Sequence, residues 1–149
     1  MSNQFDPRDP EFESRVAQSF ADQAIMRTIG ASLVEIAPGR VEIELPYRPD
    51  LTQQDGFLHA GVSATIMDSA CGYAAFSLMP ADARVLTIEF KINLLAPAAG
   101  DRFRAIGRVR KPGRSVFVAE GELLAERETG QKLVATMHAT LMAVSTKDN

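Results

Sequence analysis

Cysteine, histidine and tryptophan are scarce in this 149-residue sequence, which has one cysteine, two histidines and no tryptophan. The single cysteine, Cys71, cannot form an internal disulfide, and no cluster of cysteine and histidine has the spacing of a metal site. The sequence also lacks a GxGxxG after a strand, the P-loop pattern GxxxxGK(S/T) and the GxSxG elbow. We therefore expect no metal site, and we exclude the dinucleotide-binding, P-loop and serine-triad classes.

A strong excess of one charge and long apolar runs are also absent. The net charge is -3, with 46% hydrophobic and 23% charged residues, which is typical of soluble globular proteins and not of nucleic-acid binders. No run is long enough to span a bilayer, and the first residues lack the layout of a signal peptide. We expect one cytoplasmic domain over residues 1–149, with a flexible N-terminus at 1–9 and neither nucleic-acid nor membrane partners.

The chain is organised around residues 56–79, which are rich in helix formers and free of proline. Apart from Asp68, this stretch carries no charge after His59. A lone acid on a helix built for burial is paired or functional, whereas the alternative is a solvated charge on an outer face. The helix face that we expect to meet a sheet carries Val62, Ile66, Tyr73 and Ser77, flanked by Met67 and Ala70. The opposite face carries small residues around Asp68, namely Ala64, Thr65, Cys71, Gly72 and Ala75.

Strand patterns stand on both sides of this helix. Residues 12–30 fit an amphipathic helix, and residues 32–47 fit a hairpin that turns at Pro38 and Gly39. Beyond residue 85 the apolar period changes to two and predicts four long strands, at 86–94, 103–110, 117–123 and 133–143. The small inward residues of these strands, Ala105, Gly107, Ala119 and Gly121, suit a sheet lying close on the helix. We predict an α+β fold in which a five- to six-stranded antiparallel sheet wraps the long central helix, with an N-terminal helix added.

The first of these four strands is predicted to alternate without interruption. Leu86, Ile88, Phe90, Ile92 and Leu94 then share one face, and Thr87, Glu89, Lys91 and Asn93 share the other.

The candidate site lies where the loop 53–58 leads into the central helix. Free backbone N–H groups at a helix start, here those of Ala60 and Gly61, can hold a developing oxyanion. The alternative is that this sequence only makes a tight helix entry, capped by His59. Cys71 would need a base such as His59 to act as a nucleophile, but three helical turns separate them. His138 lies on the polar side of a strand, which indicates a surface position.

The order Gly56, His59-Ala60-Gly61 and then Asp68, nine residues after the histidine, resembles the HGG and Asp signature of the PaaI-like hotdog-fold thioesterases, the family of phenylacetate degradation. The resemblance extends over about residues 15 to 144. It implies a hotdog fold that hydrolyses acyl-CoA thioesters to the free acid and CoA without metal or bound cofactor. It also implies homodimers that share each active site and often associate into tetramers.

The resemblance assigns roles by position. The backbone N–H of Ala60 would polarise the thioester carbonyl, and His59 and Gly61 would shape that turn. Asp68, reaching in from the other subunit, would activate water or attack directly. Two further positions match less closely. Gln53 stands where catalytic relatives have an Asn that orients the carbonyl. Thr87 stands where the family often has a Ser or Thr that positions the water, but it is expected on the strand face opposite the apolar residues.

A basic cluster, Arg108, Arg110, Lys111 and Arg114, could bind the phosphates of CoA, or it could be a solvated basic turn. A hotdog protein that binds acyl-CoA without chemistry is the competing function, and the presence of Asp68 favours the enzyme. Hydratase or dehydratase chemistry would be expected to show a paired Asp and His on a different loop, which we do not find.

Overall fold

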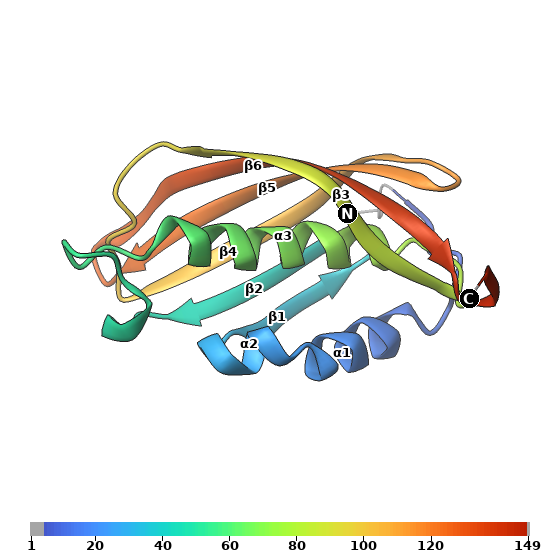
Figure 1. Cartoon of the computed structure of the whole chain (residues 1–149), viewed down its shortest axis with the longest axis horizontal. Helices are drawn as coiled ribbons and strands as arrows, with labels where there is room; N and C mark the ends of the chain where they lie inside the picture. Colours follow the sequence, from blue (N-terminus) through green and yellow to red (C-terminus); the bar gives the residue numbers. More distant parts are fainter. Residues whose placement is uncertain (1–4, 149) are drawn as a thin grey trace.

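The computed structural model describes residues 5–148. Its elements are α1 (Phe12–Asp22), α2 (Ala24–Ile29), β1 (Ser32–Ala37), β2 (Arg40–Pro46), the short 3-10 helix η1 (Pro49–Leu51), α3 (Ala60–Phe76), β3 (Ala83–Leu94), β4 (Arg102–Pro112), β5 (Val116–Arg127), β6 (Gly130–Ser145) and η2 (Thr146–Asp148). The six strands form one antiparallel sheet in the order β1-β2-β4-β5-β6-β3, and α3 lies against one face of it (Figure 1). The predicted α+β hotdog fold is confirmed, with six strands around the long helix.

Glycines on the inner face of the sheet let α3 approach it closely. A Cβ atom at Gly107 would lie 2.3 Å from the carbonyl of Ala70. A Cβ atom at Gly121 would lie 3.0 Å from the Sγ atom of Cys71. Both distances are shorter than ordinary contacts, so the prediction drawn from the small inward residues is confirmed.

The predicted faces of α3 are partly wrong. Cys71 packs against the sheet, although we expected it on the opposite face. Tyr73, expected to meet the sheet, instead contacts Phe20 of α1, with ring centroids 6.0 Å apart. The reason is that α1 covers part of α3 that the sheet leaves open, so the C-terminal half of α3 is buried on all sides. A helix of this kind has no polar face from which the apolar one can be recognised.

The N-terminal segment departs from prediction in two ways. The expected single helix is interrupted at Gln23, whose backbone is extended, so that α1 and α2 are separate. Of the flexible N-terminus predicted at 1–9, residues 1–4 lie outside the described residues, and the rest contacts the domain. Arg8 donates hydrogen bonds to the carbonyls of Gly113 and Arg114, and buried Asp9 pairs with Arg15 at 3.2 Å.

Strand β3 lies at an edge of the sheet, and its alternation is broken. Its pairing with β6 shifts register between Thr87 and Glu89, which marks a β-bulge. Thr87 pairs with buried Leu141, so it shares the inner side of the sheet with Phe90, whose partner on β6 is also buried. The uninterrupted alternation predicted for this strand is therefore wrong, because one extra residue exchanges the two faces.

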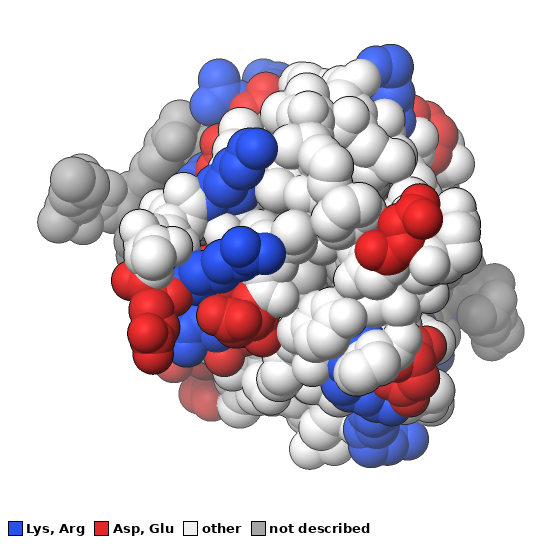
Figure 2. All heavy atoms as spheres, turned by 90° about the vertical axis from the view of Figure 1, so that its left-hand side faces the viewer, with Lys and Arg blue, Asp and Glu red and all other residues white. Residues whose placement is uncertain are grey.

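One end of the molecule brings together three connections that are far apart in sequence. The loop that enters α3, the connection from β3 to β4 and the β5–β6 hairpin lie at the left of Figure 1. Figure 2 faces this end and shows a largely uncharged surface with charged side chains around it. Within residues 5–148, no helix is long and apolar enough to cross a membrane, and no cluster of His, Cys, Asp and Glu could hold a metal ion.

Candidate active site

The start of α3 presents one free backbone donor. His59 is the N-cap, and its Nδ1 atom accepts a hydrogen bond of 2.8 Å from the N–H of Gly61. The carbonyl of His59 accepts from the N–H groups of Val62 and Ser63. Among the described residues, the N–H of Ala60 has no acceptor. The expected pair of donors is thus reduced to Ala60, and the alternative in which His59 caps the helix is also realised.

Glycine at position 61 follows from this cap. A Cβ atom there would lie 3.0 Å from Nδ1 of His59 and would press on the imidazole ring. Because Nδ1 is the acceptor, the ring must carry its proton on Nε2. His59 and Gly61 therefore fix the geometry of the turn that exposes the N–H of Ala60.

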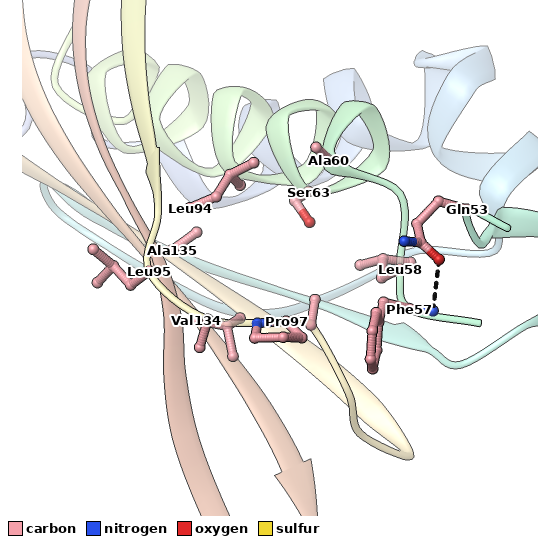
Figure 3. A pocket seen from close by; sticks show the side chains of 12 residues that line it. Gln53, Phe57, Leu58, Ala60, Ser63, Leu94, Leu95, Pro97, Val134 and Ala135 are labelled. Atoms are coloured by element: carbon pink, nitrogen blue, oxygen red, sulfur yellow. Dashed lines mark hydrogen bonds between the residues drawn. The ribbon is translucent and has the colours of Figure 1, made fainter. Parts of the chain in front are cut away.

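Ala60 lines a cavity of about 440 Å³ (Figure 3). The residues that line it come from the loop before α3, the first turn of α3, the end of β3, the connection from β3 to β4 and β6: Gln53, Phe57, Leu58, Ala60, Ser63, Leu94, Leu95, Ala96, Pro97, Ala98, Val134 and Ala135. The volume of this cavity and its mainly apolar lining are typical of a site that binds a small molecule. Ser63 points its hydroxyl into the cavity, a feature that its position three residues after Ala60 could have predicted.

Gln53 holds the loop as well as lining the cavity. Its Oε1 atom accepts hydrogen bonds from the backbone N–H groups of Asp55 and Phe57, and its Nε2 atom donates to the Asp55 carboxylate at 3.3 Å. Figure 3 shows the Nε2 atom on the cavity side. The side chain is therefore fixed in place with a donor group turned toward the cavity.

Asp68 lies near the middle of α3 and accepts a 2.8 Å hydrogen bond from the hydroxyl of Thr87. Within residues 5–148, no Lys, Arg or His pairs with this carboxylate. Partial burial raises the pKa of Asp68, and the Thr87 bond opposes that rise. A half-buried acid without a counter-charge and with a raised pKa is a candidate for proton transfer.

A second, smaller cavity of about 180 Å³ adjoins Asp68 and Thr87. Its polar wall was not predicted from the sequence. Gln23 shares hydrogen bonds with the hydroxyls of Ser69 and Tyr73, at 3.2 to 3.4 Å. The break between α1 and α2 at Gln23 turns its amide toward α3, and the sequence signals neither the break nor this contact.

One chain holds the two parts of the candidate site apart. Ala60 and Asp68 are eight residues apart on α3, or about 12 Å along the axis at 1.5 Å per residue. An oxyanion donor and a base acting through one water must each lie within about 3 Å of their reacting atoms. Among the described residues, none lines both cavities. A single chain therefore presents two half-sites, one at Ala60 and one at Asp68.

Comparison with known proteins identifies the family. The model of the thioesterase superfamily matches residues 55–131, which include Ala60, Asp68 and Thr87. The chain belongs to the thioesterase superfamily. A solved thioesterase family protein from Silicibacter pomeroyi is 52% identical, with a TM-score of 0.89 over 90% of this chain and 98% of that one. The 1,4-dihydroxy-2-naphthoyl-CoA hydrolase of Listeria monocytogenes is 26% identical over 117 residues, covering 78% of this chain and 93% of the relative.

The PaaI protein from the phenylacetic acid degradation operon of E. coli has the same fold. Its TM-score is 0.79 at 19% identity, over 91% of this chain and 95% of that one. The predicted family is confirmed.

Cys71 of this thioesterase has the environment of a structural residue. It is fully buried, and burial raises the pKa of its thiol to about 12. The thiol therefore stays protonated and packs against the sheet.

The basic cluster expected to bind CoA lies at the opposite end of the thioesterase domain from Ala60. The N–H of Val109 bonds to Gly39, and Gly39 in turn contacts Ser77, just beyond the C-terminus of α3. Two guanidinium groups of this cluster, both on β4, form ion pairs with carboxylates on β5. Arg108 pairs with Glu122 at 2.9 Å, and Arg110 pairs with Glu120 at 3.3 Å. The structure thus does not bring Arg108, Arg110, Lys111 and Arg114 to the Ala60 cavity of the same chain.

Proposed function

We propose that this thioesterase hydrolyses acyl-CoA thioesters to the free acid and CoA. The observation that carries the proposal is the presence, on one helix, of a free N–H at Ala60 and an acid without counter-charge at Asp68. Acyl transfer needs these two functions, a donor for the oxyanion and a base for the attacking water. The similarity to a curated CoA thioester hydrolase supports the same conclusion.

The chemistry follows from the two groups. Asp68 takes a proton from a water molecule as the water oxygen bonds to the thioester carbon. The carbonyl oxygen becomes negative and accepts the hydrogen bond of the Ala60 N–H. When the intermediate collapses, the C–S bond breaks, and protonated Asp68 returns its proton to the leaving CoA thiolate. Direct attack by Asp68 is the other route: its carboxylate bonds to the thioester carbon, the C–S bond breaks to release CoA, and a mixed anhydride remains. Water that opens this anhydride at the Asp68 carbonyl would place ¹⁸O from labelled water in the Asp68 carboxylate.

The remaining residues have supporting roles in this proposal. Thr87 orients the Asp68 carboxylate and the attacking water through its 2.8 Å hydrogen bond. Gln53 orients the thioester carbonyl with its Nε2 group. His59 and Gly61 hold the turn that presents the N–H of Ala60.

A homodimer formed along β3 would join the two half-sites. The β3 edge is long and carries exposed apolar side chains, including Leu86 at 57%, Ile88 at 54% and Leu94 at 56% exposure. Such an edge favours pairing with another strand. Leu94 belongs to the Ala60 cavity and Thr87 to the Asp68 cavity. Antiparallel pairing of two β3 strands around Phe90 sets the Ala60 half-site of one chain against the Asp68 half-site of its partner, twice per dimer.

Association of such dimers into tetramers and a cytoplasmic location stay predictions. Mass photometry of the purified protein would measure the oligomeric state.

The first test is CoA release by the wild type and Asp68→Asn over aryl, short-chain and medium-chain acyl-CoAs. We expect turnover by the wild type and a loss of at least about 100-fold in the variant, as for removal of a general base. A variant that retains most of the activity contradicts the mechanism. If neither protein releases CoA but both bind acyl-CoA, the protein is a binding module and not an enzyme.

The shared site is tested by a heterodimer of two inactive chains. One chain carries Asp68→Asn and the other Ala60→Pro, and two affinity tags isolate the mixed dimer. One of its two sites then combines an intact Ala60 with an intact Asp68, so about half of the wild-type activity per dimer should return. A mixed dimer as inactive as both parents would contradict the shared site.

A further inference from the structure

A second groove opens beside the Ala60 cavity. It has a volume of about 420 Å³, and Phe57 and Pro97 line both hollows, so the two are neighbours. The far wall of this groove is the β5–β6 hairpin, with Arg127 and Lys132. A ligand held at Ala60 can therefore extend over Phe57 and Pro97 to two basic side chains.

The strand register places these two charges on one face. Lys132 pairs with Ala125, and Arg127 stands two residues beyond Ala125 on the same strand. Residues two apart on a strand, and residues directly opposite, point to the same side of a sheet. Ala125 is buried and also lines the groove, so this side is the one that faces it.

Arg127 and Lys132 are the basic residues that line this groove, and Arg127 also borders a hollow lined by Asp101, Glu126 and Glu128. Within residues 5–148, neither forms an ion pair, whereas Arg102 and Arg104 nearby both pair with Glu126. Glu128 is in the same hairpin but does not line the groove. Figure 2 shows basic side chains beside the uncharged centre of this end of the molecule. Two exposed, unpaired cations beside a groove attract a phosphorylated ligand.

We propose that this groove binds the phosphate-bearing nucleotide part of the CoA thioester, with Arg127 and Lys132 on its phosphates. The inference rests on the proposed function, because it takes the thioester carbonyl to lie at the N–H of Ala60. The pantetheine arm then crosses Phe57 and Pro97, and the nucleotide lies outside against the hairpin. Arg127 offers a planar fork of donors to phosphate oxygens, and Lys132 offers a point charge. This location replaces the one expected from Arg108, Arg110, Lys111 and Arg114.

The test compares thioesters that carry the same acyl group on CoA and on pantetheine, which has no phosphate. For the double variant Arg127→Ala/Lys132→Ala, we expect the KM for acyl-CoA to rise about tenfold, because each surface contact to phosphate contributes about a factor of three to five. The kcat and the KM for acyl-pantetheine should stay unchanged. Equal KM changes for both substrates, or none for acyl-CoA, would overturn the proposal.

Two matched double variants complete the experiment. Arg27→Ala/Lys147→Ala removes the same charge elsewhere and should leave both KM values unchanged; an equal rise in its KM for acyl-CoA would show an effect of net charge alone. Lys111→Ala/Arg114→Ala tests the rival location, and a selective rise in its KM for acyl-CoA would overturn the proposal. Arg127 and Lys132 are exposed, so the melting temperature should not change.

Calorimetric binding of CoA itself separates this inference from the proposed function. A wild type that binds CoA but hydrolyses no thioester, with weakened CoA binding in Arg127→Ala/Lys132→Ala, supports the groove and refutes the enzyme. An active wild type whose CoA affinity is unchanged by that double variant refutes the groove alone. A wild type that neither binds CoA nor hydrolyses its thioesters refutes both.

Discussion

Ala60→Pro removes the proposed oxyanion donor without disturbing the helix that carries it. Ala60 is the first residue of α3, where proline is well tolerated because the N–H at this position makes no bond within the helix. His59, which would precede the proline, is already extended, with φ -62° and ψ 137°. A residue before proline prefers this conformation. The variant should therefore fold, and its melting temperature should equal or exceed that of the wild type.

The expected effect on turnover is large. The structure provides one free N–H at the helix start among the described residues, so no neighbouring backbone group can replace it. Removing one oxyanion donor costs about 100- to 1000-fold in kcat, or about 2.7 to 4 kcal/mol of transition-state stabilisation. We expect a loss in that range, with the KM much less affected because the donor acts mainly in the transition state.

The assay is steady-state CoA release, with Ala60→Gly as the matched control. Glycine keeps the N–H and removes a methyl group, so this variant should stay within about threefold of the wild-type kcat. The inhibition constant of the product CoA reports whether the proline ring blocks the groove, and it should be unchanged. An Ala60→Pro enzyme with a kcat within about fivefold of the wild type would refute the oxyanion role of Ala60.

Three further predictions concern Asp68, its hydrogen bond from Thr87 and the helix–sheet contact. In the proposed mechanism Asp68 acts as the carboxylate, and burial raises its pKa above the ordinary 3.8, so kcat/KM should fall as the pH drops through that raised value. Thr87→Val removes a hydrogen bond that favours the charged form, so the acid limb of the pH–rate profile should move to higher pH; an unmoved limb would contradict the role of Thr87. Gly107→Ala places a Cβ atom 2.3 Å from the backbone of Ala70 and should lower the free energy of unfolding by about 3 kcal/mol or more in urea denaturation. A loss below about 0.5 kcal/mol would show that α3 can move away from the sheet at little cost.

The fold could be predicted from the sequence because most of its signals are local. The change from helical period to strand period near residue 85 and the glycines of the inner face both persist in the structure. Features set by neighbours could not be predicted. The bulge at Ile88 inserts one residue into a regular alternation, and no residue near it is a glycine or proline that would mark the change. The burial of Tyr73 against α1 depends on where a separate helix packs.

In the candidate site, too, some features could be predicted from the sequence and others could not. The donor at Ala60 could be predicted, because it follows from a helix start with a short side chain. The loss of the second donor could not, since it depends on the rotamer of His59. The bond from Thr87 to Asp68 depends on the bulge, which turns a residue expected outside toward the helix. The pairing of Arg108 and Arg110 could not be predicted either, because closeness in sequence says nothing about the carboxylates of a neighbouring strand, here Glu120 and Glu122.

The exposure of the β3 edge and the partial burial of Asp68 are linked in the proposed dimer. Thr87 lies on β3 and bonds Asp68, so a partner strand along this edge removes water from the carboxylate as well as from the apolar side chains. Desolvation disfavours the charged form of Asp68 and raises its pKa, whereas the positive N-terminal end of the partner's α3, which this dimer sets against Asp68, favours the charged form and lowers it. Dissociation of the dimer would weaken catalysis because Asp68 loses the oxyanion donor of the partner.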